Sequence, residues 1–277
     1  MTVQELTASL TRAGLEAHAR ELAALARPAI GIDLRPCAQN SLTIGASRFG
    51  GIPDLPDGFE WPVYRKRPLA FLGQIDLSAV PRVKRSALPR SGTLAFFYEV
   101  HSMLWGFDPK DRGCARVAYF APTTPLVRTM PPAKTTVWNP CELVFTLRVD
   151  LVDSGDLLFQ SIEPALGESQ LETYWKVLDA QAPRAYHHLL GHPQLLQNDM
   201  RLECQLATNG VYIGGARKAL RKRASRAAAD WELLLQLDEN ERVGWEWGTS
   251  GRIYFWIRKQ DLAARRFEKA WLILQCT

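Results

Sequence analysis

The chain has 277 residues, of which 47% are apolar and 23% are charged, and these proportions exclude disorder over most of its length. Its 34 Lys and Arg against 29 Asp and Glu give a net charge of only +5, too small to require nucleic acid as a partner. The five cysteines are far apart and include no C-x-x-C pair, which disfavours a disulfide framework and a cysteine zinc site.

The N-terminal region lacks the pattern of a secretion signal, and no apolar run reaches the roughly 20 residues that span a bilayer. We therefore expect a cytoplasmic protein with no membrane partner. Leu and Ala recur at helical spacing over residues 3–26, which predicts an N-terminal amphipathic helix that Pro28 ends. An extended segment over 29–34 follows.

Residues 41–152 are rich in β signals and in Gly and Pro turns. Apolar and aromatic runs predict strands at 69–75, 93–100, 116–121 and 143–149. The Pro- and Thr-rich segment 122–140 predicts a loop with at most one short edge strand.

Helical patterns dominate after residue 165 and alternate with strands near the C-terminus. The predicted helices are 171–178, 183–190, 200–208, 216–230 and about 260–269. The predicted strands are 231–237, 243–247 and 252–257, followed by the apolar segment 271–275. The fold class is therefore α+β, with a mixed, largely antiparallel β-sheet core, an N-terminal helix and helices inserted in the second half.

Two parts of the sequence resemble each other. Both have an apolar strand ending in Gln, an aliphatic residue and Asp, and then Ser-Gly and an aromatic strand: 69–76 with 91–98, and 231–238 with 250–257. One interpretation is an internal duplication, with units 41–150 and 185–277 in a single domain over 1–277; the other is a chance match of short apolar strands. Duplication makes Gln74 equivalent to Gln236, and Asp76 equivalent to Asp238. It predicts that both Gln side chains are buried on adjacent or pseudo-symmetric central strands and bond to backbone, because an unpaired buried amide costs about 1–3 kcal/mol.

The same residues carry a family resemblance over nearly the whole chain. The matching segments are 47–56, Trp61-Pro62, 71–77, 188–193, Gln197, 203–206, 231–247, 254–257 and 271–276. On these the sequence resembles the YwqG-like family of bacterial proteins, a domain of unknown function. The family commonly has an acidic residue in the turn after its Trp-Gly, and the turn 247–251 here has none. The resemblance implies a mixed α+β fold and supplies no established activity.

Clustered histidines raise the question of a metal site. His188 and His192 have i,i+4 spacing beside His187, which would place two ligands on one helix face. The set lacks the Glu of H-E-x-x-H and is incomplete for zinc, so a helix-capping histidine is the favoured interpretation. Cys204 has apolar neighbours and no local activating group, and no phosphate-binding loop occurs. We therefore expect no metal, no cofactor and no identified catalytic residue.

Asp76 and Asp238 supply the enzyme alternative. Two carboxylates facing each other across a pseudo-symmetric cleft, with a histidine near, would allow hydrolase-type acid–base chemistry. Aspartates after strands more often cap turns. Whether the chain is an enzyme stays open at this level.

The segment 217–226 supplies a nucleic-acid alternative, since it holds six cations in ten residues. No aromatic residue that would stack on bases is interleaved with them. Nucleic acid is therefore disfavoured, and a solvated basic face or a patch for an acidic protein is preferred.

The loop 50–67 combines prolines with Asp54, Trp61, Tyr64 and Arg65, residue types that form hot spots of protein interfaces. It predicts that Trp61, Tyr64 and Arg65 line a partner-binding surface; the alternative is that Trp61 is a core lid packed on Phe71. The candidate binding residues are Asp54, Trp61, Tyr64, Arg65, Gln74, Asp76, His188, Gln236 and Asp238. The favoured function is a cytosolic, non-enzymatic protein-binding module of open oligomeric state, with a toxin-neutralising, immunity-type protein as the sharper hypothesis.

Overall fold

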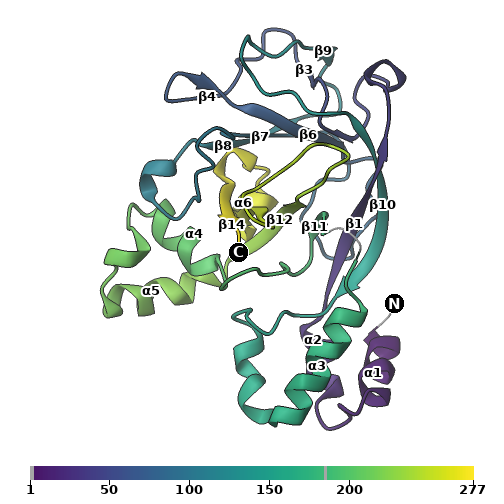
Figure 1. Ribbon diagram of the computed structural model, residues 1–277, viewed down its shortest axis with the longest axis vertical. Helices are drawn as coiled ribbons and strands as arrows, with labels where there is room; N and C mark the ends of the chain where they lie inside the picture. Colours follow the sequence, from purple (N-terminus) through teal and green to yellow (C-terminus); the bar gives the residue numbers. More distant parts are fainter. Residues whose placement is uncertain (1–2, 184–185) are drawn as a thin grey trace.

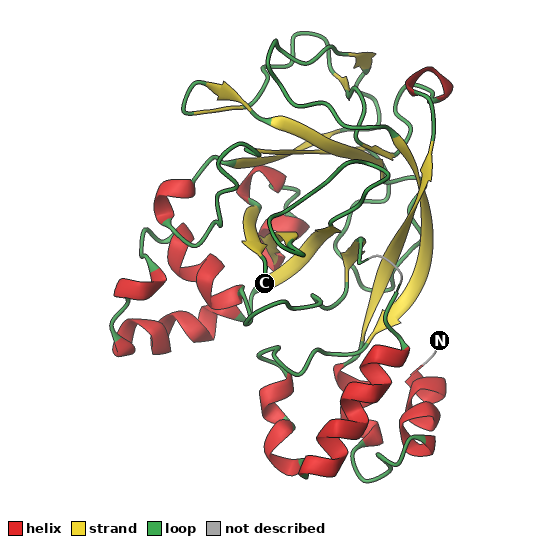
Figure 2. Ribbon diagram, viewed as in Figure 1, coloured by secondary structure: helices red, strands yellow, loops and turns green. Residues whose placement is uncertain are grey.

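A ten-stranded antiparallel sheet forms the centre of the molecule in the computed structural model, which describes residues 3–183 and 186–277 (Figures 1 and 2). The strands, in their order across the sheet, are β14 (Trp271–Gln275), β13 (Arg252–Arg258), β12 (Trp231–Asp238), β11 (His188–Leu190), β1 (Arg27–Pro36), β10 (Cys141–Asp150), β2 (Arg48–Phe49), β6 (Ala70–Asp76), β7 (Thr93–Tyr98) and β8 (Ala115–Phe120). The sheet curls into a nearly closed barrel, because its two end strands, β8 and β14, come into contact.

The strand order has two-fold pseudo-symmetry. About the central β1–β10 pair, β2 corresponds to β11, and β6, β7 and β8 correspond to β12, β13 and β14. The correspondence extends to detail: the β6–β7 ladder shifts register between Phe71 and Gly73, and the β12–β13 ladder shifts between Leu233 and Leu235. β1 takes the place in the second half that β10 has in the first, although it precedes both predicted units. The structural repeat agrees with the sequence echo, and the unit boundaries 41–150 and 185–277 stay a prediction.

Three apolar clusters stabilise the molecule. The largest fills the barrel with side chains from both halves of the sheet, including Phe49, Phe96 and Phe255. A second cluster lies under α1 (Val3–Arg12), α2 (Ala19–Leu25) and α3 (Glu168–Ala180), which form a helical group at one end of β1 and β10 (Figure 1). The third joins α4 (Arg201–Thr208) to the outer face of β12, β13 and β14 through Trp231 and Trp256.

Short elements complete the chain. They are α5 (Lys218–Ala228), α6 (Lys259–Ala263), the 3-10 helices η1 (Gln39–Ser41), η2 (Pro109–Asp111), η3 (Phe159–Ser161), η4 (Glu163–Ala165), η5 (Ile213–Gly215) and η6 (Phe267–Lys269), and the two-stranded pairs β3 (Asp54–Leu55) with β9 (Val127–Arg128) and β4 (Val63–Tyr64) with β5 (Arg67–Pro68). Within the described ranges, no helix combines the length and the apolar character needed to cross a bilayer.

The α+β class and the largely antiparallel sheet are confirmed, and four local predictions are wrong. The helix over about 260–269 is the short helix α6 followed by η6, because Arg265 adopts φ +56° between them. The single helix over 3–26 is two helices, because Gly14 adopts φ +94° and turns the chain. A helix was predicted over 183–190, and residues 184–185 of it lie outside the described residues. Its last three residues form strand β11, because pairing with β1 and β12 overrides the helical pattern. The strand over 243–247 is a tight loop that returns the chain, with Gly244 at φ +90° and an isolated bridge from Asn240 to Trp245.

Candidate functional site

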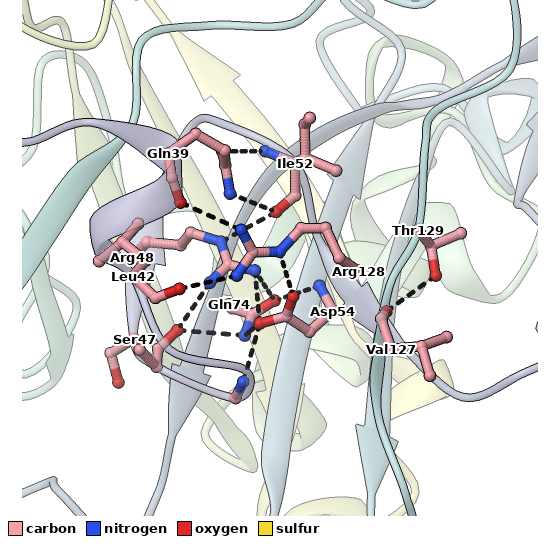
Figure 3. Close-up of polar contacts among 12 residues, drawn as sticks. Gln39, Leu42, Ser47, Arg48, Ile52, Asp54, Gln74, Val127, Arg128 and Thr129 are labelled. Carbon is pink, nitrogen blue, oxygen red and sulfur yellow. Dashed lines mark hydrogen bonds and ion pairs between the residues drawn. The ribbon is translucent and has the colours of Figure 1, made fainter.

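The motif 47–54 folds as β2, a two-glycine turn and the start of β3. Figure 3 shows the polar contacts that Arg48 and Asp54 of this motif make with Gln74 and Arg128. Gly50 and Gly51 have φ of +65° and +67°, which L side chains rarely adopt. A Cβ at Gly50 would also lie 2.1 Å from the Asn139 carbonyl oxygen, so only glycine fits. The turn reverses the chain and brings the Asp54 carboxylate against the Arg48 guanidinium.

Asp54 is held between two arginines in the protein interior. Its carboxylate oxygens lie 2.6 Å from Arg48 Nη2 and 2.6 Å from Arg128 Nε, and the Gly45 amide donates to it at 2.8 Å. Burial alone would raise the pKa of Asp54, but the hydrogen bonds from Arg128 and Arg48 outweigh burial and hold that pKa below its ordinary value. Asp54 is therefore a buried counter-ion rather than a residue of the surface on which it was predicted.

Gln74 completes this cluster from the neighbouring strand β6. Its Oε1 accepts from the Asp54 amide at 2.8 Å and from Arg48 Nη2 at 3.1 Å. Its Nε2 donates to the Ala46 carbonyl at 3.1 Å and to Asp54 Oδ2 at 3.2 Å. The fully buried amide uses its acceptor and both donors, so the cluster fixes the β2–β3 turn to the sheet and is structural.

The second half of the sheet repeats this arrangement around Gln236. Its Nε2 donates to the Tyr186 carbonyl at 2.7 Å and to Gln194 Oε1 at 2.9 Å, and its Oε1 accepts from the Gln194 amide at 3.0 Å. Gln194 thus takes the place of Asp54, and His188 takes the place of Arg48. Both Gln74 and Gln236 are 0% exposed and bond to backbone, which confirms the prediction made for them.

The three clustered histidines have separate structural roles. His188 lies on strand β11 and not on a helix, so the i,i+4 helix face proposed for it with His192 does not exist. His188 Nδ1 donates to the Leu190 carbonyl at 2.8 Å, and burial lowers the pKa of His188 to about 4. His187 Nδ1 accepts from the Asp238 amide, whereas His192 Nε2 donates to the Leu25 carbonyl. Over residues 3–183 and 186–277, no group of three or more His, Cys, Asp or Glu side chains converges in a way that would hold a metal ion.

Asp76 and Asp238 end corresponding strands, and each is engaged within its own half. Asp76 Oδ1 accepts from the amide and the hydroxyl of Ser78 at 2.9 and 2.8 Å, which is a turn cap. Asp238 Oδ1 lies 2.9 Å from Arg252 Nε, and its Oδ2 accepts from the Tyr186 amide at 3.2 Å. These contacts fit the turn-capping interpretation rather than a shared acid–base pair.

An open groove of about 960 Å³ lies where the two ends of the sheet meet. Its walls come from the segment 59–63, the loop before β8, and the starts of β8 and β14. Trp61 lines it in a half-buried position, with its ring edge-on to Phe97 at 5.4 Å and its indole N–H donating to the Leu69 carbonyl at 2.9 Å. Trp61 is therefore both packed on the core, on Phe97, and open to the groove.

Two further tryptophans lie in the wall of the groove, both buried, and each carries an arginine on its ring face. The Arg258 guanidinium lies 5.1 Å from the ring centre of Trp231, and the Arg112 guanidinium lies 5.5 Å from that of Trp271. Such cation–π contacts preorganise the guanidinium groups at the groove. The exposed charged residues that line it are Glu60, Arg112, Arg116, Glu268 and Lys269.

The loop before β6 contributes fewer accessible side chains to a partner-binding surface than predicted. Tyr64 is buried, with its hydroxyl donating to the Lys110 carbonyl at 2.9 Å. Arg65 is exposed at the tip of the β4–β5 hairpin and stacks over the Tyr64 ring at 5.0 Å. Of the residues predicted in this loop, only Trp61 and Arg65 are accessible to a partner.

Two residues of these structural clusters were not predicted from the sequence. Arg128 lies in the Pro-rich loop far from Asp54 and has no local signal that would reveal its ion pair. Gln194 could have been found, because the echo aligns Gly51-Ile52-Pro53-Asp54 with 191–194, Gly-His-Pro-Gln.

Comparison with known families rests on these same segments. The model of a domain of unknown function (DUF1963) matches residues 47–276, which contain both Gln clusters and all but the first strand of the central sheet. No curated protein matches the sequence. Because the match covers most of the chain, the chain belongs to the DUF1963 family.

Proposed function

We propose that this chain is a non-enzymatic protein-binding module that recognises its partner at the groove between β8 and β14. The observation that carries the proposal is the lining of the groove: half-buried Trp61 on one wall and, on another, the guanidinium groups of Arg112 and Arg258. These two arginines cover the buried rings of Trp271 and Trp231 and are themselves open to the groove. Trp and Arg dominate the residues that supply most binding energy in protein interfaces. A half-buried Trp61 held by one hydrogen bond and one ring contact offers a surface that needs little ordering on binding.

The polar clusters support a binding role over a catalytic one. Arg48, Asp54 and Gln74 satisfy one another inside the protein, and Asp238 is paired with Arg252. These groups are committed to holding turns. The groove instead combines the half-buried ring of Trp61 and two ring-stacked arginines with a rim of both charges, a composition that suits a protein-binding site.

The test uses the purified chain as bait in host lysate. The groove variant is Arg116→Glu with Lys269→Glu, and its matched control is Arg12→Glu with Lys176→Glu on the helical group, which makes the same change in net charge. We expect a stoichiometric partner with the wild type and the control, and at least tenfold weaker binding of the purified partner to the groove variant. Arg65→Glu tests whether the interface extends onto the β4–β5 hairpin.

Two results would contradict the proposal: no stoichiometric partner under several growth conditions, or a partner that binds the groove variant as tightly as the wild type. The finer proposal of a cytosolic, toxin-neutralising protein has its own test, because cells that produce such a partner would then survive only alongside a chain with an intact groove.

A further inference from the structure

A row of three aromatic rings, exposed at both ends and half-buried in the middle, lies beside α4 and α5. It is formed by Trp105 and Phe107 from the loop after β7 and by Tyr212 from the loop between α4 and α5. The ring centres of Trp105 and Phe107 are 5.8 Å apart, and those of Phe107 and Tyr212 are 6.1 Å apart. Trp105 is 40% exposed and Tyr212 is 48% exposed, so the ends of the row present aromatic surface to solvent.

The aromatic row leads directly to a helix that is rich in cations. Tyr212 precedes η5, and Arg221 of α5 donates from Nη1 to the Ile213 carbonyl at 3.4 Å. Six cations of this segment are exposed: Arg217, Lys218, Arg221, Lys222, Arg223 and Arg226. In the part of the chain that the structure describes, none of them forms an ion pair with a carboxylate. Arg221 lies near enough to Glu203 to oppose the rise that burial causes in the pKa of that carboxyl, and the charge of the other five cations is available to an external anion.

The position of these cations on α5 adds to the attraction for anions. Arg217 is the N-cap of the helix without a side-chain cap bond, Lys218 follows it, and the first turn has no acidic residue. The N-terminus of a helix already carries a partial positive charge, so cations there destabilise the helix slightly. A bound phosphate would offset both charges at once.

We propose that this aromatic–basic surface, made of Trp105, Phe107, Tyr212 and the cations of 217–226, binds single-stranded nucleic acid. Flat rings that stack on bases, next to cations that follow the backbone, are the means by which proteins bind single strands without base-specific contacts. A duplex hides its base faces, and an acidic peptide would leave the aromatic row unused. From the sequence, nucleic-acid binding by residues 217–226 was disfavoured because the segment holds no aromatic residue. The fold supplies the aromatic rings from residues 105–107 and 212.

The residues substituted to test this surface differ from those substituted to test the proposed protein-binding groove. The experiment measures the fluorescence anisotropy of a labelled twenty-nucleotide oligo(dT) titrated with the full chain, at several salt concentrations. A random twenty-base-pair duplex and phosphatidylserine-containing vesicles are titrated in parallel. The aromatic variant is Trp105→Ala with Tyr212→Ala. The basic variant is Lys218→Glu, Arg221→Glu and Lys222→Glu, and its matched control is Arg12→Glu, Arg20→Glu and Lys176→Glu on the distant helical group (Figure 1).

We expect the wild type and the control to bind oligo(dT) more tightly than the duplex. The aromatic variant should bind oligo(dT) about tenfold more weakly, since stacking contributes about 1–3 kcal/mol per base. In the basic variant, the slope of log affinity against log salt should fall by about 2 for three lost phosphate contacts, at about 0.7 per contact on single strands.

The proposal is overturned if the duplex binds as tightly as oligo(dT) and the aromatic variant binds like the wild type, because the surface is then a simple polycation. It is also overturned if oligo(dT) does not bind and vesicles do, or if neither binds. Circular dichroism of each variant establishes that the substitutions, all at exposed side chains, leave the fold intact. The groove variant Arg116→Glu with Lys269→Glu should retain oligo(dT) binding within a few-fold, which separates this test from that of the proposed function.

Discussion

The substitution Asp54→Asn removes the carboxylate that pairs with the fully buried Arg48. Arg48 keeps three neutral acceptors, at the Ile52 and Ala46 carbonyls and at Gln74 Oε1, with distances of 3.0, 3.3 and 3.1 Å. Removing one partner of a buried ion pair costs about 3–5 kcal/mol, and these acceptors place the loss near the lower end. For a chain of this size, about 3 kcal/mol corresponds to a fall in Tm of about 6–12 °C.

Chemical denaturation of the Asp54→Asn variant measures this loss, and Asp57→Asn, an exposed acid of the same loop, is the matched control with an expected change within about 0.5 kcal/mol. Adding Arg48→Met to Asp54→Asn should recover part of the loss, because the uncompensated charge disappears with the guanidinium. A loss below about 1 kcal/mol for Asp54→Asn, or a further loss in the double variant, would refute the assignment of Asp54 as the essential counter-ion.

Three further predictions concern pH and packing. Burial alone would raise the pKa of Asp156, but its contacts with His192 and Arg201 lower that pKa to about 2. The contribution of Asp156 to the free energy of unfolding is therefore present above the unfolded pKa near 3.9 and is lost as pH falls toward 2. In chemical denaturation over this pH range, the free energy of unfolding of Asp156→Asn should depend less steeply on pH than that of the wild type. Burial lowers the pKa of His188 to about 4, so the free energy of unfolding falls between about pH 6.5 and 4, and His188→Gln should remove part of that fall. Half-buried Trp61→Ala should cost less than the about 3–5 kcal/mol expected of fully buried Trp245→Ala; equal losses in thermal melts would show that Trp61 is a core residue unsuited to a binding site.

The sheet could be predicted well where local pattern and final environment agree. The run 69–75 is nearly all apolar because β6 is covered on both faces, and the equivalent run at 231–237 is buried for the same reason. The burial of Gln74 and Gln236 could be predicted from the similarity of the two sequence segments. A polar residue at the same position in two similar apolar strands needs hydrogen-bond partners that the strands themselves cannot supply. Both found them in the turn that follows β2 or β11.

The failures have a different physical origin. His188, Leu189 and Leu190 carry no strand signal of their own, and β11 exists because β1 and β12 offer backbone partners on both sides. The groove and the aromatic–basic surface were hidden for a related reason. Each depends on segments that are distant in sequence: Trp61 and Trp271 line one groove, and the rings of Phe107 and Tyr212 are in contact. No local spacing in the sequence reports that such residues come together.

Comparing the two pseudo-symmetric halves shows which polar contacts both turns share and which are present in only one half. Gln74 and Gln236 bond the same backbone positions, yet one faces the charged pair Arg48 and Asp54 and the other the uncharged positions of His188 and Gln194. The turn therefore needs the glutamine and not the charge.

The two halves of the sheet also differ at the groove where β8 and β14 meet. The ladders place Arg116 opposite Phe97 and Trp271 opposite the equivalent Trp256, so Arg116 and Trp271 are counterparts that both line the groove. A cation and an aromatic ring on equivalent positions make this groove asymmetric within a symmetric frame. Closing a barrel does not require such asymmetry, and in the proposed binding site it would favour one partner in one orientation. We therefore expect substitution of the exposed Arg116, unlike substitution of the buried Trp271, to change binding to the proposed partner without changing the fold.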